Sequence, residues 1–316
     1  MSASNASGNF PTTTTDAPVL SVVVVPFGGL ENLERCLSAL QAQVYSTGGE
    51  IVVPWPESFG SCDSMATRFP GVSFSGPATS DEHPALRALG CRSTRGQIIA
   101  LTEAQCTPDA GWCAAVVECH SRFAGVVGGL VEKDGADSAA EWAVYLADYG
   151  RYMRPVAEGL SASLSDVNVS YKRETLMAVQ AVWAESFHEN VVHDAIRERG
   201  AALWLSPLLV VRHHRKVRIG SLLHERSQHG RAYAASRAAN TRPATRLALL
   251  AGSVILPALL ILRVAVMVTQ KRRHVRQFFA ALPSLSAMAV AWSCGELAGY
   301  LTRSPGALSP PSESSA

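Results

Sequence analysis

The sequence predicts an α/β fold, with a mostly parallel sheet flanked by helices and followed by a C-terminal membrane-associated helical region. Three observations predict this fold class. Short apolar runs rich in β-branched residues alternate with stretches whose apolar residues recur at helical spacing, as in βαβ units. One such run, Gln97–Thr102, ends in polar residues, and open α/β sheets bind ligands beyond the carboxyl ends of their strands. Two long apolar stretches follow in the C-terminal part.

Composition sets limits on the class of protein. The chain has 316 residues, of which 47% are hydrophobic, which suits one globular domain with additional elements. A net charge of +2 gives no argument for nucleic acid as a partner. The seven cysteines form no CxxC pair and no zinc-binding spacing, which favours reduced thiols.

The two ends of the chain have a different composition from the rest. Residues 1–17 are rich in Ser, Thr and Asn, without the basic start and apolar core of a signal peptide. Residues 303–316 have a similar polar composition with added prolines. Both segments are predicted to be disordered tails.

The first ordered residues form a predicted βαβ unit. Val19–Pro26 is an almost unbroken β-branched run, as expected of a strand covered on both faces. Leu30–Val44 has helical spacing, and Glu50–Pro54 is a second strand. The crossover predicts parallel pairing. The turn after the first strand contains neither a GxGxxG fingerprint nor a P-loop.

The run at Gln97–Thr102 carries the strongest signal for chemistry. It reads as a buried strand, and Glu103 follows at its carboxyl end, two residues before Gln105. Thr107–Trp112 contains a Pro and a Gly, which are typical of a turn that leads into a helix. Alone, this stretch also fits a strand, a turn and a capped helix without any function.

This stretch resembles the DxD region of the family 2 glycosyltransferases, which have a GT-A fold. The resemblance implies that Glu103 and Gln105 lie near the diphosphate of the sugar donor and its metal ion. Gln105 replaces the second carboxylate, and a neutral amide is a weaker ligand for a hard cation. Glu103 is therefore the expected ligand of Mg²⁺ or Mn²⁺.

Three further residues match the donor side of the family. Pro26 ends the first strand as in the family, and Glu57 follows the second strand where the family has an Asp-rich turn. Arg87, in a predicted helix within His83–Gly96, matches a family arginine that suits a diphosphate. A solvated helix arginine is the alternative. Trp55 either stacks on the nucleotide base or packs in the fold.

The resemblance also implies acceptor and catalytic positions. Trp142 lies where the family varies to suit its acceptors, although aromatic residues at helical spacing also fit a core. Asn168 is the second acceptor candidate, with backbone capping as its alternative. Glu189, at a predicted helix start, is the expected base for the acceptor hydroxyl, and Asp194 is the runner-up. Helix capping is the alternative for Glu189.

The domain organisation follows from these matches. Residues 18–215 form the expected GT-A nucleotide-sugar domain, and residues 216–246 an amphipathic interfacial segment whose arginines meet anionic headgroups. Residues 247–302 hold two predicted membrane helices or a helical hairpin, with Arg263 able to snorkel. One basic cluster precedes the first helix and another separates the two helices, so the positive-inside rule gives no single orientation for two spanning helices. Helices that lie in the interface or re-enter the membrane are therefore an alternative. Two buried helices of a soluble protein are another alternative.

The resemblance implies a membrane-associated glycosyltransferase of the hexosyltransferase type. It would move a sugar from a nucleoside-diphosphate sugar to a hydroxyl of a lipid, polysaccharide or other acceptor, with inversion. Its GT-A domain is expected on the cytoplasmic side of the cell membrane, with no nucleic acid as a partner. The alternative is an inactive relative that binds a nucleotide sugar or supports a membrane assembly. Gln105 and Asn190 favour that alternative, whereas Glu103 and Glu189 oppose it.

Overall fold

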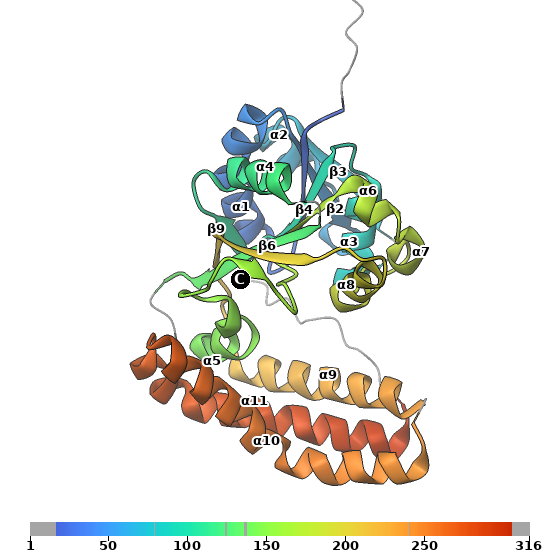
Figure 1. The fold of residues 1–316 in the computed structure, drawn as a ribbon, viewed down its shortest axis with the longest axis vertical. Coiled ribbons are helices and arrows are strands. Elements are labelled where there is room, and N and C mark those ends of the chain that lie inside the picture. Colours follow the sequence, from blue (N-terminus) through green and yellow to red (C-terminus); the bar gives the residue numbers. More distant parts are fainter. Residues whose placement is uncertain (1–16, 79, 124, 136–137, 240, 305–316) are drawn as a thin grey trace, which may run out of the picture.

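The structure is a computed structural model that describes residues 17–78, 80–123, 125–135, 138–239 and 241–304 (Figure 1). The predicted tails at residues 1–17 and 303–316 lie almost entirely outside the described residues.

The described residues form a nine-stranded mixed sheet with the order β3-β2-β1-β4-β8-β6-β9-β5, and β7 pairs with β9. The strands are β1 (Leu20–Val25), β2 (Glu50–Pro56), β3 (Val72–Ala78), β4 (Ile98–Glu103), β5 (Cys106–Pro108), β6 (Val126–Lys133), β7 (Gly159–Leu160), β8 (Val169–Lys172) and β9 (Leu203–His213). The predicted parallel pairing is confirmed, because Val23 of β1 lies opposite Val52 of β2 and Leu101 of β4. Strand β8 is antiparallel to both of its neighbours, β4 and β6. The fold is therefore the predicted α/β class with a mixed sheet.

Helices flank this sheet (Figure 1). They are α1 (Leu30–Ser46), α2 (Asp63–Arg68), α3 (His83–Arg92), α4 (Trp112–Arg122), α5 (Ala139–Asp148), α6 (Arg173–Met177), α7 (Gln180–Trp183) and α8 (Glu189–Glu198), with single 3-10 turns η1 (Glu57–Phe59) and η2 (Gly150–Tyr152).

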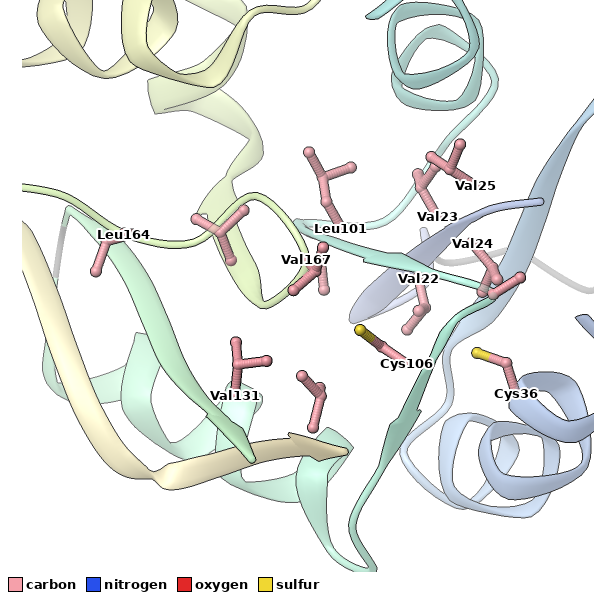
Figure 2. Close-up of a cluster of buried hydrophobic side chains, with 14 of the residues drawn as sticks. Val22, Val23, Val24, Val25, Cys36, Leu101, Cys106, Val131, Leu164 and Val167 are labelled. Atoms are coloured by element: carbon pink, nitrogen blue, oxygen red, sulfur yellow. The ribbon is translucent and has the colours of Figure 1, made fainter. Parts of the chain in front are cut away.

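Strand β1 is buried on both faces. Figure 2 shows its four valines with Cys36 of α1 and Cys106 of β5 nearby, and Val23 and Val25 point away from Val22 and Val24. On the Val23 face, α3 approaches so closely that a Cβ on Gly90 would collide with the Val23 side chain. Helices on both faces explain why β1 consists of β-branched residues without polar alternation.

Two local predictions were wrong. Thr107 and Pro108, predicted as the start of a turn, belong with Cys106 to strand β5, in which Cys106 pairs with His213 of β9. Its partner lies far away in the sequence, so the local Pro and Gly signal could not reveal the pairing. Strand β2 also runs further than predicted, through Pro54 to Pro56, with a register shift against β3 at the prolines.

Three long helices form a layer beside the α/β domain, with α5 next to it (Figure 1). They are α9 (Ile219–Ala239), α10 (Pro243–Lys271) and α11 (Val275–Thr302). Helix α11 packs on both α9 and α10. Side chains at Gly230, Gly295 and Gly299 would collide with the backbone of the facing helix, so these glycines permit the close approach of α9 and α11.

Helices α10 and α11 are long and apolar enough to cross a membrane, judged by length and composition alone. Helix α10 exposes large apolar side chains: Val254 is 70% exposed, Ile255 60% and Leu262 58%. This exposure argues against α10 as the core helix of a soluble protein. Helix α11 is more enclosed, with Phe278 and Met288 buried.

Candidate functional site

Four charged side chains meet beyond the carboxyl end of β4. Arg87 Nη2 donates to Glu103 Oε1 and to Asp166 Oδ2, each at 2.5 Å. Arg87 Nη1 lies 3.7 Å from Glu189 Oε2. We call these four residues the Arg87 cluster. The structure thus brings together three residues predicted as site residues and adds Asp166, for which the sequence predicted no role.

Each member of the Arg87 cluster comes from a different segment. Glu103 is the last residue of β4 and lies opposite Val25 at the end of β1. Arg87 is on the buried face of α3, and Asp166 lies in the loop before β8. Glu189 is the first residue of α8. The cluster therefore occupies the strand-end position where α/β sheets place ligands.

Burial and charge act together on the cluster. Burial works against the charge of Arg87, but Asp166, Glu103 and Glu189 raise the Arg87 pKa above its ordinary value. Burial raises the pKa of Glu103, against the influence of Arg87. Burial and the charge of Asp166 raise the pKa of Glu189. One guanidinium thus faces three carboxylates, and the excess negative charge favours a bound proton or a bound cation.

A chain of contacts leads from this cluster towards α9. His83 Nδ1 lies 3.8 Å from Glu103 Oε1, and the His83 ring packs edge-on against Phe27 at 3.9 Å. Burial, with Arg87 nearby, lowers the His83 pKa to about 4, so its ring is neutral at pH 7. The guanidinium of Arg215 lies over the Phe27 ring and also pairs with Glu225 of α9 at 2.5 Å.

Gln105 is buried beside the turn that follows β1. Its side chain is buried beside Gly28, where φ is 83°, and a Cβ on Gly28 would collide with the Gln105 amide. Its backbone oxygen accepts a hydrogen bond from the His214 amide at 2.7 Å. The carboxylate that joins Glu103 around Arg87 comes instead from Asp166. The only local signal for Asp166 is a lone acid in a Ser-rich loop ahead of a strand.

Asn168 has a structural role. It is fully buried, and its Oδ1 accepts from Trp112 Nε1 at 2.9 Å. Its Nδ2 donates to the backbone oxygens of Leu130 and Leu209 at 2.8 and 3.1 Å. These bonds occupy both ends of the amide and join three segments, which is a structural role for Asn168.

The two candidate tryptophans pack against other parts of the chain. The Trp142 ring packs near the rings of His274, which lies between α10 and α11, and Tyr145. The ring centroids are 4.7 Å and 5.8 Å apart, respectively. Trp55 is 4% exposed, and its Nε1 donates to the backbone oxygen of Gly60. Trp55 therefore follows the packing alternative, and Trp142 lies at the junction with the C-terminal helices.

The remaining predicted residues lie around the strand ends. Pro26 is buried directly after β1, and Glu57 is exposed in η1 after β2. Asp194 is on an outer face of α8, with its side chain 64% exposed and paired with Arg197. Asp194 is thus poorly placed to serve as a second base for a reaction beside Arg87.

The donor set for a metal ion is small. Within the described residues, no group of three or more His, Cys, Asp or Glu side chains is arranged to hold a metal ion. Glu103 and Asp166 nevertheless lie close enough to share one nitrogen of Arg87. Two carboxylates together with substrate phosphates are a common set for Mg²⁺, so the pair fits an ion that arrives with a diphosphate.

Comparison with known proteins supports the fold. No protein-family model matches the chain, and no curated protein matches it. Among solved structures, the mannosyltransferase PcManGT from Pyrobaculum calidifontis, in complex with GDP-Man and Mn²⁺, is 17% identical with a TM-score of 0.53. The match covers 90% of this chain and 88% of that one. The chain therefore has the GT-A fold.

A second solved structure resembles part of the chain. It is GalNAc-T7 with UDP, GalNAc and Mn²⁺, with 15% identity and a TM-score of 0.47. The match covers 64% of this chain but 45% of that one, so this chain spans less than half of that protein's length.

Proposed function

We propose that this protein is a GT-A glycosyltransferase that moves a sugar from a nucleoside-diphosphate sugar to an acceptor hydroxyl with inversion. The observation that carries the proposal is the Arg87 cluster, which gathers three carboxylates and one arginine beyond the strand ends of a GT-A fold. The likeness to a mannosyltransferase solved with GDP-Man and Mn²⁺ supports the choice of donor class.

Glu103 and Asp166 are the residues that would hold a divalent ion, Mg²⁺ or Mn²⁺. Each gives one oxygen to Arg87 Nη2, and among the described side chains none bonds to the other oxygen of either carboxylate. The ion would neutralise charge on the departing diphosphate. The raised pKa of Glu103 reflects a buried carboxylate with too little positive charge around it, and a cation would correct this imbalance.

Glu189 is the proposed general base. It lies at the start of α8, with its side chain 26% exposed, so an acceptor has access to it. Its carboxylate would take the proton while the acceptor oxygen bonds to the anomeric carbon. The bond from that carbon to the phosphate oxygen breaks, and the electron pair leaves with the nucleoside diphosphate. Burial and Asp166 raise the pKa of Glu189, which strengthens it as a base.

We also propose that the GT-A domain comprises residues 18–215 and works at the cytoplasmic face of the cell membrane, held there by the C-terminal layer. The exposed apolar face of α10 supports this proposal. Arg226, expected among the arginines facing headgroups, instead turns inward to pair with Asp148 of α5. The interfacial role of residues 216–246 therefore rests on the other arginines.

An inactive relative is the competing proposal, and a specific contact favours it. Arg87 already neutralises part of the charge on Glu103 and Asp166, which a structural ion pair would do without any donor. The deciding experiment incubates the purified full-length chain with labelled nucleotide sugars and a membrane extract, with and without Mn²⁺. Sugar transfer that disappears in Glu189→Gln supports the enzyme. Donor binding without any transfer supports the inactive relative.

A further inference from the structure

A cavity of about 210 Å³ lies between α5 and the C-terminal layer. Its walls are mostly apolar and come from α5, α10 and α11, with Arg151 from η2 and Arg226 from α9. An engineered apolar cavity of about 150 Å³ is enough to hold benzene. The cavity therefore has room for a short hydrocarbon segment next to the apolar outer surface of α10.

Charged side chains also line this cavity. Arg151, Arg226 and Arg263 carry three guanidinium groups, whereas Asp148 is the one carboxylate among the lining residues. Arg226 pairs with Asp148, but the buried Nε of Arg226 has no hydrogen-bond partner in the described part of the chain. The lining thus combines an apolar wall with an excess of positive charge, which suits an amphipathic anion.

Arg263 is the most unusual of these residues. It interrupts a helix that is long and apolar enough to cross a membrane. Its neighbours on the exposed face, Leu259 and Leu262, are 54% and 58% exposed. No ion pair or hydrogen bond joins Arg263 to another side chain within the described ranges. An unpaired ionisable residue at such a position is costly in an apolar environment and marks a candidate functional site.

The end of α5 leads from the cavity towards the strand ends of the sheet. Asp148, the last residue of α5, lines the cavity, and Tyr149 follows it directly. Burial raises the pKa of Tyr149, and the charges of Asp166 and Glu103 add to this shift. The Tyr149 ring packs against His213 of β9, with 4.6 Å between the ring centroids, and His213 pairs with Cys106, three residues after Glu103. Tyr149 thus links the charged lining of the cavity to the strand ends that carry the cluster.

We propose that this cavity binds an anionic phospholipid whose head carries the acceptor hydroxyl. The phosphate would lie among Arg226, Arg263 and Arg151, and the first carbons of one chain against the apolar wall. The acceptor role rests on the proposed function, whereas the lipid site stands on the cavity itself. The head with its hydroxyl would then extend past Tyr149 towards the strand ends, on the side of the sheet where the Arg87 cluster lies.

Lipid binding to the detergent-purified full-length chain tests the site directly. Native mass spectrometry would titrate the protein with phosphatidylinositol, which is anionic and bears hydroxyls, and with phosphatidylcholine of the same chain length. We expect a clear preference for phosphatidylinositol. Arg263→Leu should weaken phosphatidylinositol binding about tenfold, since it removes a charge-assisted contact. Arg122→Leu, at the exposed end of α4 and outside the cavity, also removes one positive charge and is the control that should change nothing.

A second variant guards against an effect of net charge alone. Leu260→Trp keeps all three arginines and fills part of the cavity, so it should lower binding of phosphatidylinositol as well. Equal binding of the two lipids, or unchanged binding in both cavity variants, would overturn the proposal. Displacement of the lipid by inorganic phosphate at equal concentration would also overturn it, because the site would then recognise phosphate alone.

The outcome for the lipid site is separable from the outcome for the enzyme. Donor binding, measured by calorimetry without lipid, should be unchanged in Arg263→Leu. If wild-type protein binds phosphatidylinositol selectively but transfers no sugar to it, the acceptor role fails and the lipid site stands. If the protein transfers sugar but binds both lipids equally, the lipid site fails and the enzyme stands.

Discussion

Arg87 uses one nitrogen, Nη2, to hold Glu103 and Asp166 at the same distance, 2.5 Å. Two carboxylates are thereby held together even though neither follows the other in a motif. The two acids of the pair come from different segments: Glu103 ends β4, and Asp166 lies in the loop before β8.

Glu103→Gln should lower sugar transfer roughly a hundredfold while changing thermal stability little. The substitution keeps the size of the side chain, and Arg87 keeps Asp166 and Glu189 as partners. Initial rates over a Mn²⁺ titration, together with a melting curve, measure both effects. Glu118→Gln, on an exposed helix face, is the control. A wild-type rate in Glu103→Gln would remove Glu103 from the donor site.

Arg87→Met should destabilise the fold by about 3 to 5 kcal/mol, because it leaves buried carboxylates without their cation. Chemical denaturation of the full-length chain in detergent measures this change. Arg35→Met removes a surface pair with Glu31 and should cost at most about 1 kcal/mol. Equal effects of the two substitutions would contradict the role of Arg87 as the counter-charge of the cluster.

Glu189→Gln should abolish transfer and leave donor binding nearly intact, since a base acts on the acceptor proton. The wild-type rate should also fall with acid at a pH above the ordinary glutamate value of 4.5, because the Glu189 pKa is raised. A pH-rate profile and donor calorimetry check both statements. Asp194→Asn serves as the control, because Asp194 is exposed and paired with Arg197. If Glu189→Gln is active, Asp166 becomes the next candidate base.

Buried histidines predict a loss of stability in acid. Burial lowers the pKa of His120 and of His193 to about 4, from an ordinary value of 6.5. Their neutral forms therefore stabilise the fold above pH 6.5, and this contribution is lost as the pH falls towards 4. Melting temperatures from pH 8 to pH 4 should show the decline. His193→Gln should make it shallower, and an unchanged slope would exclude His193 as a contributor.

Membrane association should depend on the exposed face of α10. Leu262→Asp places a charge on that face, which costs about 2.5 to 3.5 kcal/mol within a bilayer. This variant should release a larger share of the full-length chain from membranes during a carbonate wash. Leu160→Asp, on an exposed strand of the α/β domain, is the control. Complete release of the wild type would refute membrane docking.

The sequence was most informative where structure is local. The β-branched runs at β1, β2 and β4 predicted strands and their parallel order, because helices cover both faces of this region. The same runs placed Glu103 at the correct sheet edge. Arg87 was found by resemblance, but its contact with Glu103 depends on how α3 packs against β1.

Features that depend on contacts between residues far apart in the chain could not be predicted from the sequence. Asp166 is a single acid in a loop, and only the antiparallel insertion of β8 beside β4 brings it to Arg87. Asn168 matched a family position, yet its partners come from three other segments. The role of Asp166 at the site and the structural role of Asn168 leave no pattern within a few residues of the sequence. Composition and spacing therefore could not predict either role.

The C-terminal layer is fastened to the α/β domain at several places. Arg226 pairs with Asp148, and Arg215 pairs with Glu225. At another place, Arg273, between α10 and α11, pairs with Glu132 of β6 at 3.0 Å, and Lys271 donates to the Met153 oxygen at 2.6 Å. Because these contacts are spread over several places, the layer is a rigid mount that holds the α/β domain in one orientation, unlike a flexible linker. On a bilayer, this mount would set the height of the Arg87 cluster above the lipid. Acceptors would then be selected by the length of their head as well as by its chemistry.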